Sequence, residues 1–143
     1  MGGMGAAWGI GFSPRTELAI NGAVALASRK RREVGAARVA QEVGTAKANL
    51  SNVLNDLKRA GLIRWDGNGS AAWGRRRPSD VSLYDIAAAV GERFRVRCHM
   101  KGSDASVGLC RRCPMKCLSR PLRSEVVELF KARRLSDLMP TRS

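Results

Sequence analysis

Apolar residues recur at helical spacing in the stretch 45–63. They fall at positions i, i+3, i+4 and i+7, which places them in one stripe on an amphipathic helix: Leu50, Val53, Leu54 and Leu57. The opposite face of this helix is polar but mostly uncharged, and it carries Lys47, Asn49, Ser51, Asn52 and Asn55. Gly61 is expected to end the helix as a left-handed cap.

Amide side chains on this polar face suit one task in particular. An amide donates and accepts hydrogen bonds, as the edges of DNA bases do, whereas Glu and Lys are the common choices for a face that only meets water. Taken alone, the stretch also fits an ordinary amphipathic core helix. The flanking sequence is therefore needed to distinguish a DNA-binding helix from a core helix.

Two further helices are predicted before this one. Ser13-Pro14 is a strong helix start, with Ser as cap and Pro at the first helical position, and the helix is expected to run to about Ser28. A short helix follows over about 35–43, and Gly44 separates it from the amide-bearing helix. This arrangement predicts a helix-turn-helix whose second helix enters the major groove with its N-terminal residues leading: Lys47, Asn49, Ser51 and Asn52.

A hairpin is predicted directly after the helix-turn-helix. Two apolar strands, 62–65 and 71–73, flank the turn sequence DGNGS, which is the arrangement of a wing. Three arginines at the base of the wing, Arg75, Arg76 and Arg77, suit phosphate contacts. We also expect Asn68 in the turn of the wing to contact DNA. The alternative is a solvated loop. Ser82 then caps a short helix, with Asp85 three residues later.

Charge favours a nucleic-acid partner. The 143 residues include 26 Lys and Arg against 12 Asp and Glu, a net charge of +14. The basic run 29–32 (RKRR) fits either a phosphate contact or a solvated helix end. No apolar run is long enough to span a membrane, so we expect a cytoplasmic protein. No catalytic constellation or phosphate-binding glycine loop is present, and an enzyme is not expected.

All four cysteines lie in one stretch without periodicity, 92–117. They follow the spacing C-x11-C-x2-C-x3-C and are Cys98, Cys110, Cys113 and Cys117. Seven Lys or Arg residues surround them against two acids, and positive neighbours favour the thiolates that bind metals. An iron–sulfur cluster and zinc both fit thiolate ligands, and unligated reduced cysteines are the third possibility. His99 is expected to be a bystander.

The last predicted element is an amphipathic helix from Pro121 to about Arg134. Its apolar positions form one stripe, which we expect to be an isologous homodimer seam: Leu122, Val126, Leu129 and Phe130. Leu135, Leu138 and Met139 are expected to extend this apolar surface. The alternative is that the helix packs on its own domain.

Taken together, these stretches resemble a known family, the winged-helix, iron–sulfur-sensing bacterial repressors that include the iron–sulfur regulator IscR and the nitric oxide regulator NsrR. The resemblance extends from about Phe12 to Met139, and it is carried by the order and spacing of four stretches: 16–19 (TELA), 50–63, 81–86 (VSLYDI) and Cys98…Cys110…Cys117-Leu118. It implies a homodimer on a roughly palindromic operator. It also implies a cluster held by three cysteines and completed by an acidic residue from the first helix of the partner subunit, a position that Glu17 matches here.

The fourth ligand stays open at this point. Cys113 is an extra cysteine, and it either replaces Glu17 as a ligand or is a spare thiol. The fold class is mainly α with a small β-hairpin wing, divided into a flexible tail (1–12), a winged helix-turn-helix domain (13–91), a cysteine-rich cluster-binding loop (92–117), and a dimerisation helix with a C-terminal tail (118–143). The predicted function is a DNA-binding transcriptional regulator, a repressor, whose operator affinity is set by an iron–sulfur cluster that senses redox, nitric oxide or iron status. The alternative is a winged-helix protein with a structural zinc site or a thiol-based redox switch.

Overall fold

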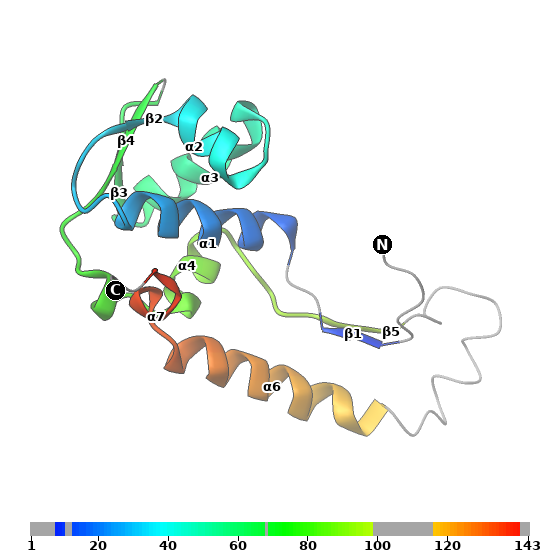
Figure 1. Ribbon diagram of the computed structural model, residues 1–143. Coiled ribbons are helices and arrows are strands. Elements are labelled where there is room, and N and C mark those ends of the chain that lie inside the picture. The colour runs from blue at the N-terminus through cyan, green and yellow to red at the C-terminus, as the bar shows by residue number, and fades with distance from the viewer. Residues whose placement is uncertain (1–7, 11–12, 68, 99–115, 141–143) are drawn as a thin grey trace.

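The computed structural model describes residues 8–10, 13–67, 69–98 and 116–140. Its elements are, in chain order, β1 (Trp8–Ile10), α1 (Pro14–Ala27), β2 (Val34–Gly35), α2 (Ala36–Val43), α3 (Lys47–Arg59), β3 (Ile63–Trp65), β4 (Ser70–Trp73), the 3-10 turn η1 (Pro78–Asp80), α4 (Leu83–Ala89), β5 (Val96–Cys98), α6 (Lys116–Ala132) and α7 (Leu135–Leu138). Helices α1 to α4 form a body with a small sheet at one side, and α6 lies below it as a long rod (Figure 1). The predicted fold class, mainly α with a small wing, is confirmed.

Helix α1 begins and packs as its sequence predicts. The Ser13 side chain accepts a hydrogen bond from the Thr16 amide at 3.3 Å, and Pro14 occupies the first turn, where its missing amide proton costs nothing. Further along, Ala19, Ala23 and Leu26 are fully buried, and the small side chains of the two alanines let the helix approach its neighbours closely. Helix α1 is therefore the central element of the core, in contact with α2, α3 and α4.

Helices α2 and α3 form the predicted helix-turn-helix. Gly44 adopts φ +76° and ends α2, and Gly61 adopts φ +79° just beyond α3, conformations that L side chains rarely adopt. The predicted apolar stripe of α3 is entirely buried, at 1% exposure or less: Leu50, Val53, Leu54 and Leu57. The polar face of α3 is left outside the core by this packing.

The wing is a three-stranded antiparallel sheet in the order β2-β4-β3, one strand more than predicted. In the predicted hairpin, Ile63 pairs with Trp73 and Trp65 with Ala71. The added strand β2 joins the other edge of β4, with Val34 opposite Ala71. Two residues are too few to show an alternating pattern, so nothing in the local sequence marks β2.

Two expectations for the ends of the domain are corrected. The tail 1–12 was expected to be flexible, yet Trp8–Ile10 forms strand β1, which pairs antiparallel with β5. The stretch 92–117 was expected to lack regular structure, yet it contains β5 and the start of α6. For the two strands the physical reason is long-range pairing, because each is stabilised by a partner far away in the sequence that no local pattern reveals.

The C-terminal helices differ from prediction in a similar way. Helix α6 begins at Lys116 rather than at Pro121, which lies inside it. Pro121 is the sixth residue of α6 and lies beyond the four amides that lack an intrahelical partner, so it removes one intrahelical hydrogen bond near the start of the helix. After α6 the chain folds back on the domain: the Leu135 amide donates to the Val81 oxygen at 2.8 Å, and Leu135 is fully buried.

Two assignments to the dimer surface are therefore wrong. Phe130, predicted in the seam, is 6% exposed and packs among Leu83, Ala87 and Phe94 of its own chain. Leu135, predicted to extend the apolar surface, belongs to the main core. Leu129 and Leu138 remain exposed, at 50% and 47%.

Within the described residues, no helix has the length and apolar character needed to cross a membrane.

Candidate nucleic-acid interface

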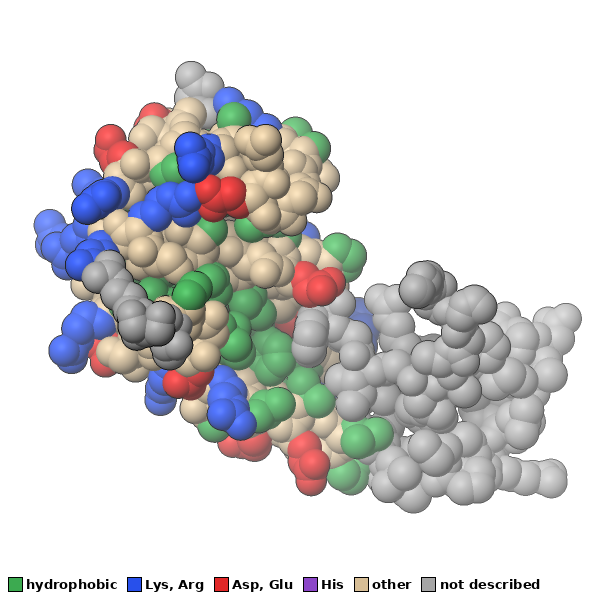
Figure 2. All heavy atoms as spheres, in the orientation of Figure 1, with side chains coloured by type: hydrophobic (Ala, Val, Ile, Leu, Met, Phe, Trp, Pro, Cys, Tyr) green, Lys and Arg blue, Asp and Glu red, His purple; other side chains and the backbone are tan. Residues whose placement is uncertain are grey.

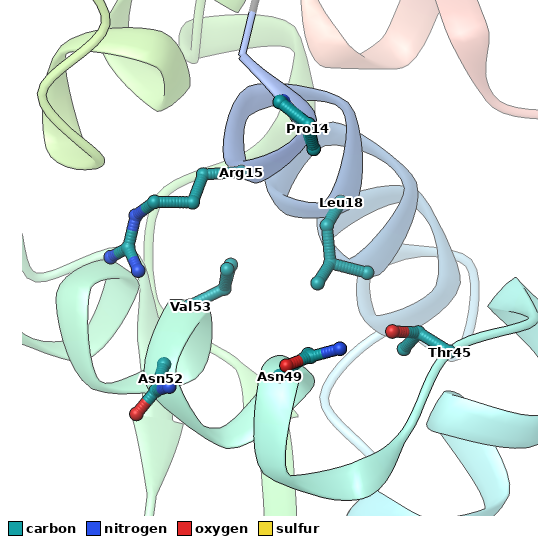
Figure 3. A pocket seen from close by; sticks show the side chains of 7 residues that line it. All are labelled: Pro14, Arg15, Leu18, Thr45, Asn49, Asn52 and Val53. Atoms are coloured by element: carbon teal, nitrogen blue, oxygen red, sulfur yellow. The ribbon is translucent and has the colours of Figure 1, made fainter.

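The N-terminal half of α3 presents its polar side chains to solvent. Lys47, Asn49 and Asn52 are exposed, and Ser51 is half-buried. Asn49 and Asn52 line a cleft of about 340 Å³ between α3 and the first turns of α1. Figure 3 shows these two amides on α3 on one side of the cleft, with Pro14, Arg15 and Leu18 of α1 on the other. Asn49 and Asn52 therefore share one accessible surface, whereas Lys47 and Ser51 do not line this cleft.

An ion-pair cluster joins α1 to α3 at the edge of this cleft. Arg15, in the first turn of α1, pairs with the carboxylate of Asp56 on α3. Arg59 donates to the other oxygen of the same carboxylate at 3.2 Å. The Asp56 side chain is only 16% exposed, so its charge is held close to both guanidinium groups. Sequence analysis did not identify Arg15, because its partner lies 41 positions later in the chain.

A second contact joins α3 to the wing. The indole nitrogen of Trp65 donates to the side-chain oxygen of Asn55 at 2.8 Å. Asn55 belongs to the predicted polar face of α3, and its side-chain oxygen holds β3 against this helix. At the turn of the wing, the Asp66 carboxylate accepts hydrogen bonds from the amides of Gly69 and Ser70 at 2.9 and 3.1 Å. Asn68, the predicted DNA contact in this turn, lies outside the described residues.

The three arginines after β4 lie at the base of the wing rather than at its turn. Arg76 donates to the Asp80 carbonyl oxygen at 3.0 Å and pairs with Asp85 at 3.4 Å. Arg77 pairs with Asp80 at 3.1 Å. Arg75 is exposed and makes no ion pair with a carboxylate of the described chain. Exposed ion pairs of this kind are weak, about 0–1 kcal/mol, so a phosphate competes well for either arginine.

Two more arginines join this basic region, and sequence analysis missed one of them. The Arg64 guanidinium donates to the Arg31 carbonyl oxygen at 2.9 Å, and the Arg31 guanidinium donates to the Arg75 carbonyl oxygen at 3.3 Å. All three residues line a cleft of about 460 Å³. Figure 2 shows Lys and Arg side chains gathered along the side of the domain that carries the sheet. Arg31 of the basic run 29–32 thus contacts two arginines of the wing region, Arg64 and Arg75.

The structure places only part of the predicted metal site. Cys98 ends β5 and Cys117 lies in the first turn of α6, two elements that contact each other. Cys110 and Cys113 lie outside the described residues. Glu17 is exposed on α1. Across the described ranges, no group of three or more His, Cys, Asp and Glu side chains lies close enough to hold a metal ion.

An acidic residue that sequence analysis did not single out fixes the start of the cysteine stretch. One carboxylate oxygen of Glu92 accepts hydrogen bonds from the Ser13 amide, at 2.8 Å, and from the Thr16 hydroxyl. The other oxygen accepts from the amides of Arg93 and Phe94 at 3.0 and 2.9 Å. Burial raises the pKa of Glu92, but these hydrogen bonds outweigh it and leave that pKa below its ordinary value.

Comparison with known proteins agrees with this architecture. The family model described as "Rrf2: Iron-dependent Transcriptional regulator" matches residues 12–141. Solved structures with the same fold include CymR of B. subtilis, the global cysteine regulator (18% identity, TM-score 0.65, covering 92% of this chain and 97% of that one). CymR of Staphylococcus aureus (19%, 0.66, 92% and 99%) and IscR of T. potens (16%, 0.64, 91% and 86%) are similar to the same degree. No curated protein matches the sequence.

The family match covers nearly the whole chain. The solved structures are less than 20% identical to this chain, so they support the fold alone. Proteins of this family are DNA-binding regulators, so the expectation that this chain is no enzyme is confirmed. The resemblance drawn from the sequence is confirmed as well. The chain belongs to the Rrf2 family of winged-helix transcriptional regulators.

Proposed function

We propose that the protein represses transcription by binding a two-fold operator as a homodimer in the cytoplasm, with α3 in the major groove. One observation carries the proposal: the apolar stripe of α3 is fully buried while Asn49 and Asn52, at its N-terminal half, face an open surface. This is the part of a recognition helix that reaches base edges. Ser51 joins these amides at the interface, while Lys47 and the wing arginines contact phosphates.

The DNA-binding part is tested by selecting operators from a random duplex pool with the purified protein. We expect an enriched, roughly palindromic sequence with half-sites about 34–36 Å apart or a multiple of that spacing. Binding of the selected duplex should weaken steeply with salt, because each phosphate contact releases counterions. Binding without any sequence preference would overturn the proposal that α3 reads bases.

The dimer seam is proposed on the face of α6 that its own domain leaves open. Leu129 is half-exposed, and Leu122 and Val126 are only partly buried. Val126 also packs at the edge of the cluster that contains Phe130. A two-fold operator requires a two-fold protein, so an isologous contact along this stripe suits the DNA-binding proposal.

We further propose that the cysteines hold an iron–sulfur cluster that regulates operator affinity. The donor set fits, because thiolates are the usual cluster ligands and Cys98 and Cys117 lie on elements in contact with each other. Such a cluster supplies one-electron chemistry whose potential follows its ligands and surroundings. The family description as iron-dependent and the similar fold of IscR from T. potens support this choice.

Cys110 completes the proposed ligand set, and Glu17 of the partner subunit competes with Cys113 for the fourth position. Iron and sulfide content after anaerobic purification tests the set. We expect Cys98→Ala, Cys110→Ala and Cys117→Ala to lose the cluster and Cys113→Ala to be milder. If Cys113 is the fourth ligand, its loss is severe and Glu17→Ala is the milder change. Full iron loading in the Cys98 and Cys117 variants would overturn the cluster proposal.

A second candidate is thiol-based or zinc-based regulation at the same cysteines. It is favoured by the similar fold of CymR from B. subtilis, which is described as a global cysteine regulator. Colourless protein with stoichiometric zinc, or operator binding that changes on thiol oxidation without iron, would support this candidate. Brown protein whose operator binding follows iron content supports the cluster.

A further inference from the structure

The start of the cysteine stretch and the start of α1 are attached to each other at two points. Strand β5, which ends at Cys98, pairs with β1, and β1 precedes α1 in the chain. Four residues before β5, the Glu92 carboxylate bonds to the amide of Ser13 and the hydroxyl of Thr16. Ser13 is the cap of α1 and Thr16 lies in its first turn. Movement of the segment that leads to Cys98 therefore acts directly on the first turn of α1.

Glu92 is itself firmly placed. Phe94, two residues later, is buried and stacks on Tyr84 and meets Phe130 edge-on, with ring centroids 5.9 and 4.9 Å apart. The carboxylate lies beside the amide groups at the start of α1, where the helix dipole favours a negative charge. Glu92 thus links the first turn of α1 to the segment before β5, which are far apart in the sequence. Its carboxylate accepts four hydrogen bonds, two from each of these parts of the chain.

The first turn of α1 also carries the arginine that contacts the recognition helix. Arg15 lies between Ser13 and Thr16 and pairs with Asp56 of α3. A cleft of about 340 Å³ lies between this turn of α1 and α3, as Figure 3 shows. The ion pair connects the two helices at the edge of this cleft. Further along, α1 is fixed by the buried Ala19 and Ala23. In the first turn, where Thr16 is fully buried, the Arg15–Asp56 ion pair is the side-chain contact that connects α1 to α3 across this cleft.

We propose that Glu92 is a positioning residue that couples the segment leading to Cys98 to the recognition helix α3. The coupling passes from Glu92 to Ser13 and Thr16 in the first turn of α1, and from that turn to α3 through the Arg15–Asp56 ion pair. The inference rests on the proposed function for its signal, but the link itself is a property of the metal-free chain. It gives a contiguous route of hydrogen bonds and one ion pair from the residues beside β5 to α3, the kind of coupling that a double-mutant cycle measures.

Glu92→Gln is the sharpest variant because it keeps the size of the side chain. Each carboxylate oxygen of Glu92 accepts from two donors, so either orientation of the Gln amide group points its NH₂ at two donor groups. The matched control is Glu33→Gln, an exposed carboxylate in the loop beyond the other end of α1. Arg15→Gln breaks the second step of the route while leaving Glu92 intact.

The test is amide hydrogen exchange of the metal-free, reduced full-length protein. In Glu92→Gln we expect exchange to rise about ten-fold in the first turn of α1 and around Asp56 in α3, the effect of losing hydrogen bonds that protect local structure. Arg15→Gln should raise exchange in α3 and leave Arg93 and Phe94 protected. Amides of α4, such as Ile86, report the overall loss of stability and should rise by a smaller factor than those of the first turn of α1 and around Asp56, whereas an equal rise everywhere would contradict the proposal. Unchanged exchange around Asp56 in Glu92→Gln would overturn the proposal.

Operator affinity then tests whether the link carries the signal. The ratio of operator dissociation constants between iron-loaded and metal-free protein should fall towards one in Glu92→Gln and in Arg15→Gln, and the double variant should show no further loss. Additive losses, or a ratio equal to that of wild type, would contradict the route. If wild type itself shows a ratio of one, the sensor proposal fails, while the exchange experiment still decides the link.

Discussion

Helices α3 and α6 are both amphipathic, but the domain uses their apolar faces differently. In α3, every residue of the apolar stripe is buried within the domain, and apart from Ala48 the side chains left outside are polar. In α6, the stripe is divided: Phe130 is buried against α4, while Leu129 is half-exposed. The surface that α3 leaves open is thus mainly polar, whereas the described part of α6 leaves open a large apolar side chain, Leu129, among charged neighbours.

This difference indicates which kind of partner each helix accepts. Amide groups that face water lose little when they bind the edges of DNA bases, because one set of hydrogen bonds replaces another. Exposed leucine gains free energy by being covered, and a second copy of the same helix is a cover that two-fold symmetry provides. Substitutions in the two helices should therefore affect different measurements.

The largest effect is expected in the buried stripe of α3. Leu57 has no exposed surface, so Leu57→Ala removes buried methyl groups and leaves a cavity, which costs about 2–5 kcal/mol of unfolding free energy. Urea denaturation measures this cost. Leu129→Ala is the matched control in α6, where an exposed leucine leaves no cavity and the change in monomer stability should stay within about 0.5 kcal/mol. Equal losses in both variants would contradict the division of the two stripes.

The next effect belongs to assembly. Leu129→Glu introduces a charge at the proposed seam and should weaken dimerisation by about 2 kcal/mol or more, as for a central interface residue. Sedimentation at micromolar concentration measures the monomer fraction. Glu128→Gln, at the neighbouring exposed position, is the control and should leave the dimer intact. A Leu129→Glu variant that stays dimeric would show that α6 is covered by something other than this seam.

Local pattern was enough to predict the DNA-binding part of the fold. The stripe of α3, the Ser13 cap and the capping box of Ser82 and Asp85 depend on residues within one or two turns of each other, so the sequence shows them directly. The glycines that end α2 and α3 were predictable for the same reason, since Gly44 and Gly61 adopt positive φ angles.

The features that the sequence did not predict depend on contacts between residues far apart along the chain. Strand β1 exists because β5 pairs with it, and the Arg15–Asp56 and Glu92–Thr16 contacts join residues from different elements. The burial of Phe130 has the same origin, because periodicity identifies an apolar face but not the surface that covers it. Charged residues such as Arg15 and Glu92 carry no local signal at all, so the link between the cysteine segment and α3 became visible only in the structure.

A smaller effect is expected on the polar face of α3. Asn52→Ala should cost about 1–3 kcal/mol in operator binding and relax specificity at the base pair that it contacts. Competition between the selected operator and scrambled DNA measures this loss. Arg77→Ala is the control from the base of the wing, and it should weaken both duplexes alike and flatten the salt dependence. If Arg77→Ala changed sequence preference and Asn52→Ala did not, base reading would have to be assigned to the wing.

The smallest effect concerns acid stability at the junction of the two regions, where Glu92 joins α1 to the segment before β5. The hydrogen bonds to its carboxylate hold the pKa of Glu92 below its ordinary value despite burial. A carboxylate whose folded-state pKa is lowered stabilises the fold above its unfolded pKa, and this contribution is lost as pH falls through the folded pKa. The free energy of unfolding of wild type should therefore fall more between neutral and acid pH than that of Glu92→Gln, by about 1 kcal/mol or less. Urea denaturation across this pH range measures the difference, with Glu33→Gln expected to follow wild type. Parallel curves for wild type and Glu92→Gln would show that the carboxylate charge does not stabilise the junction.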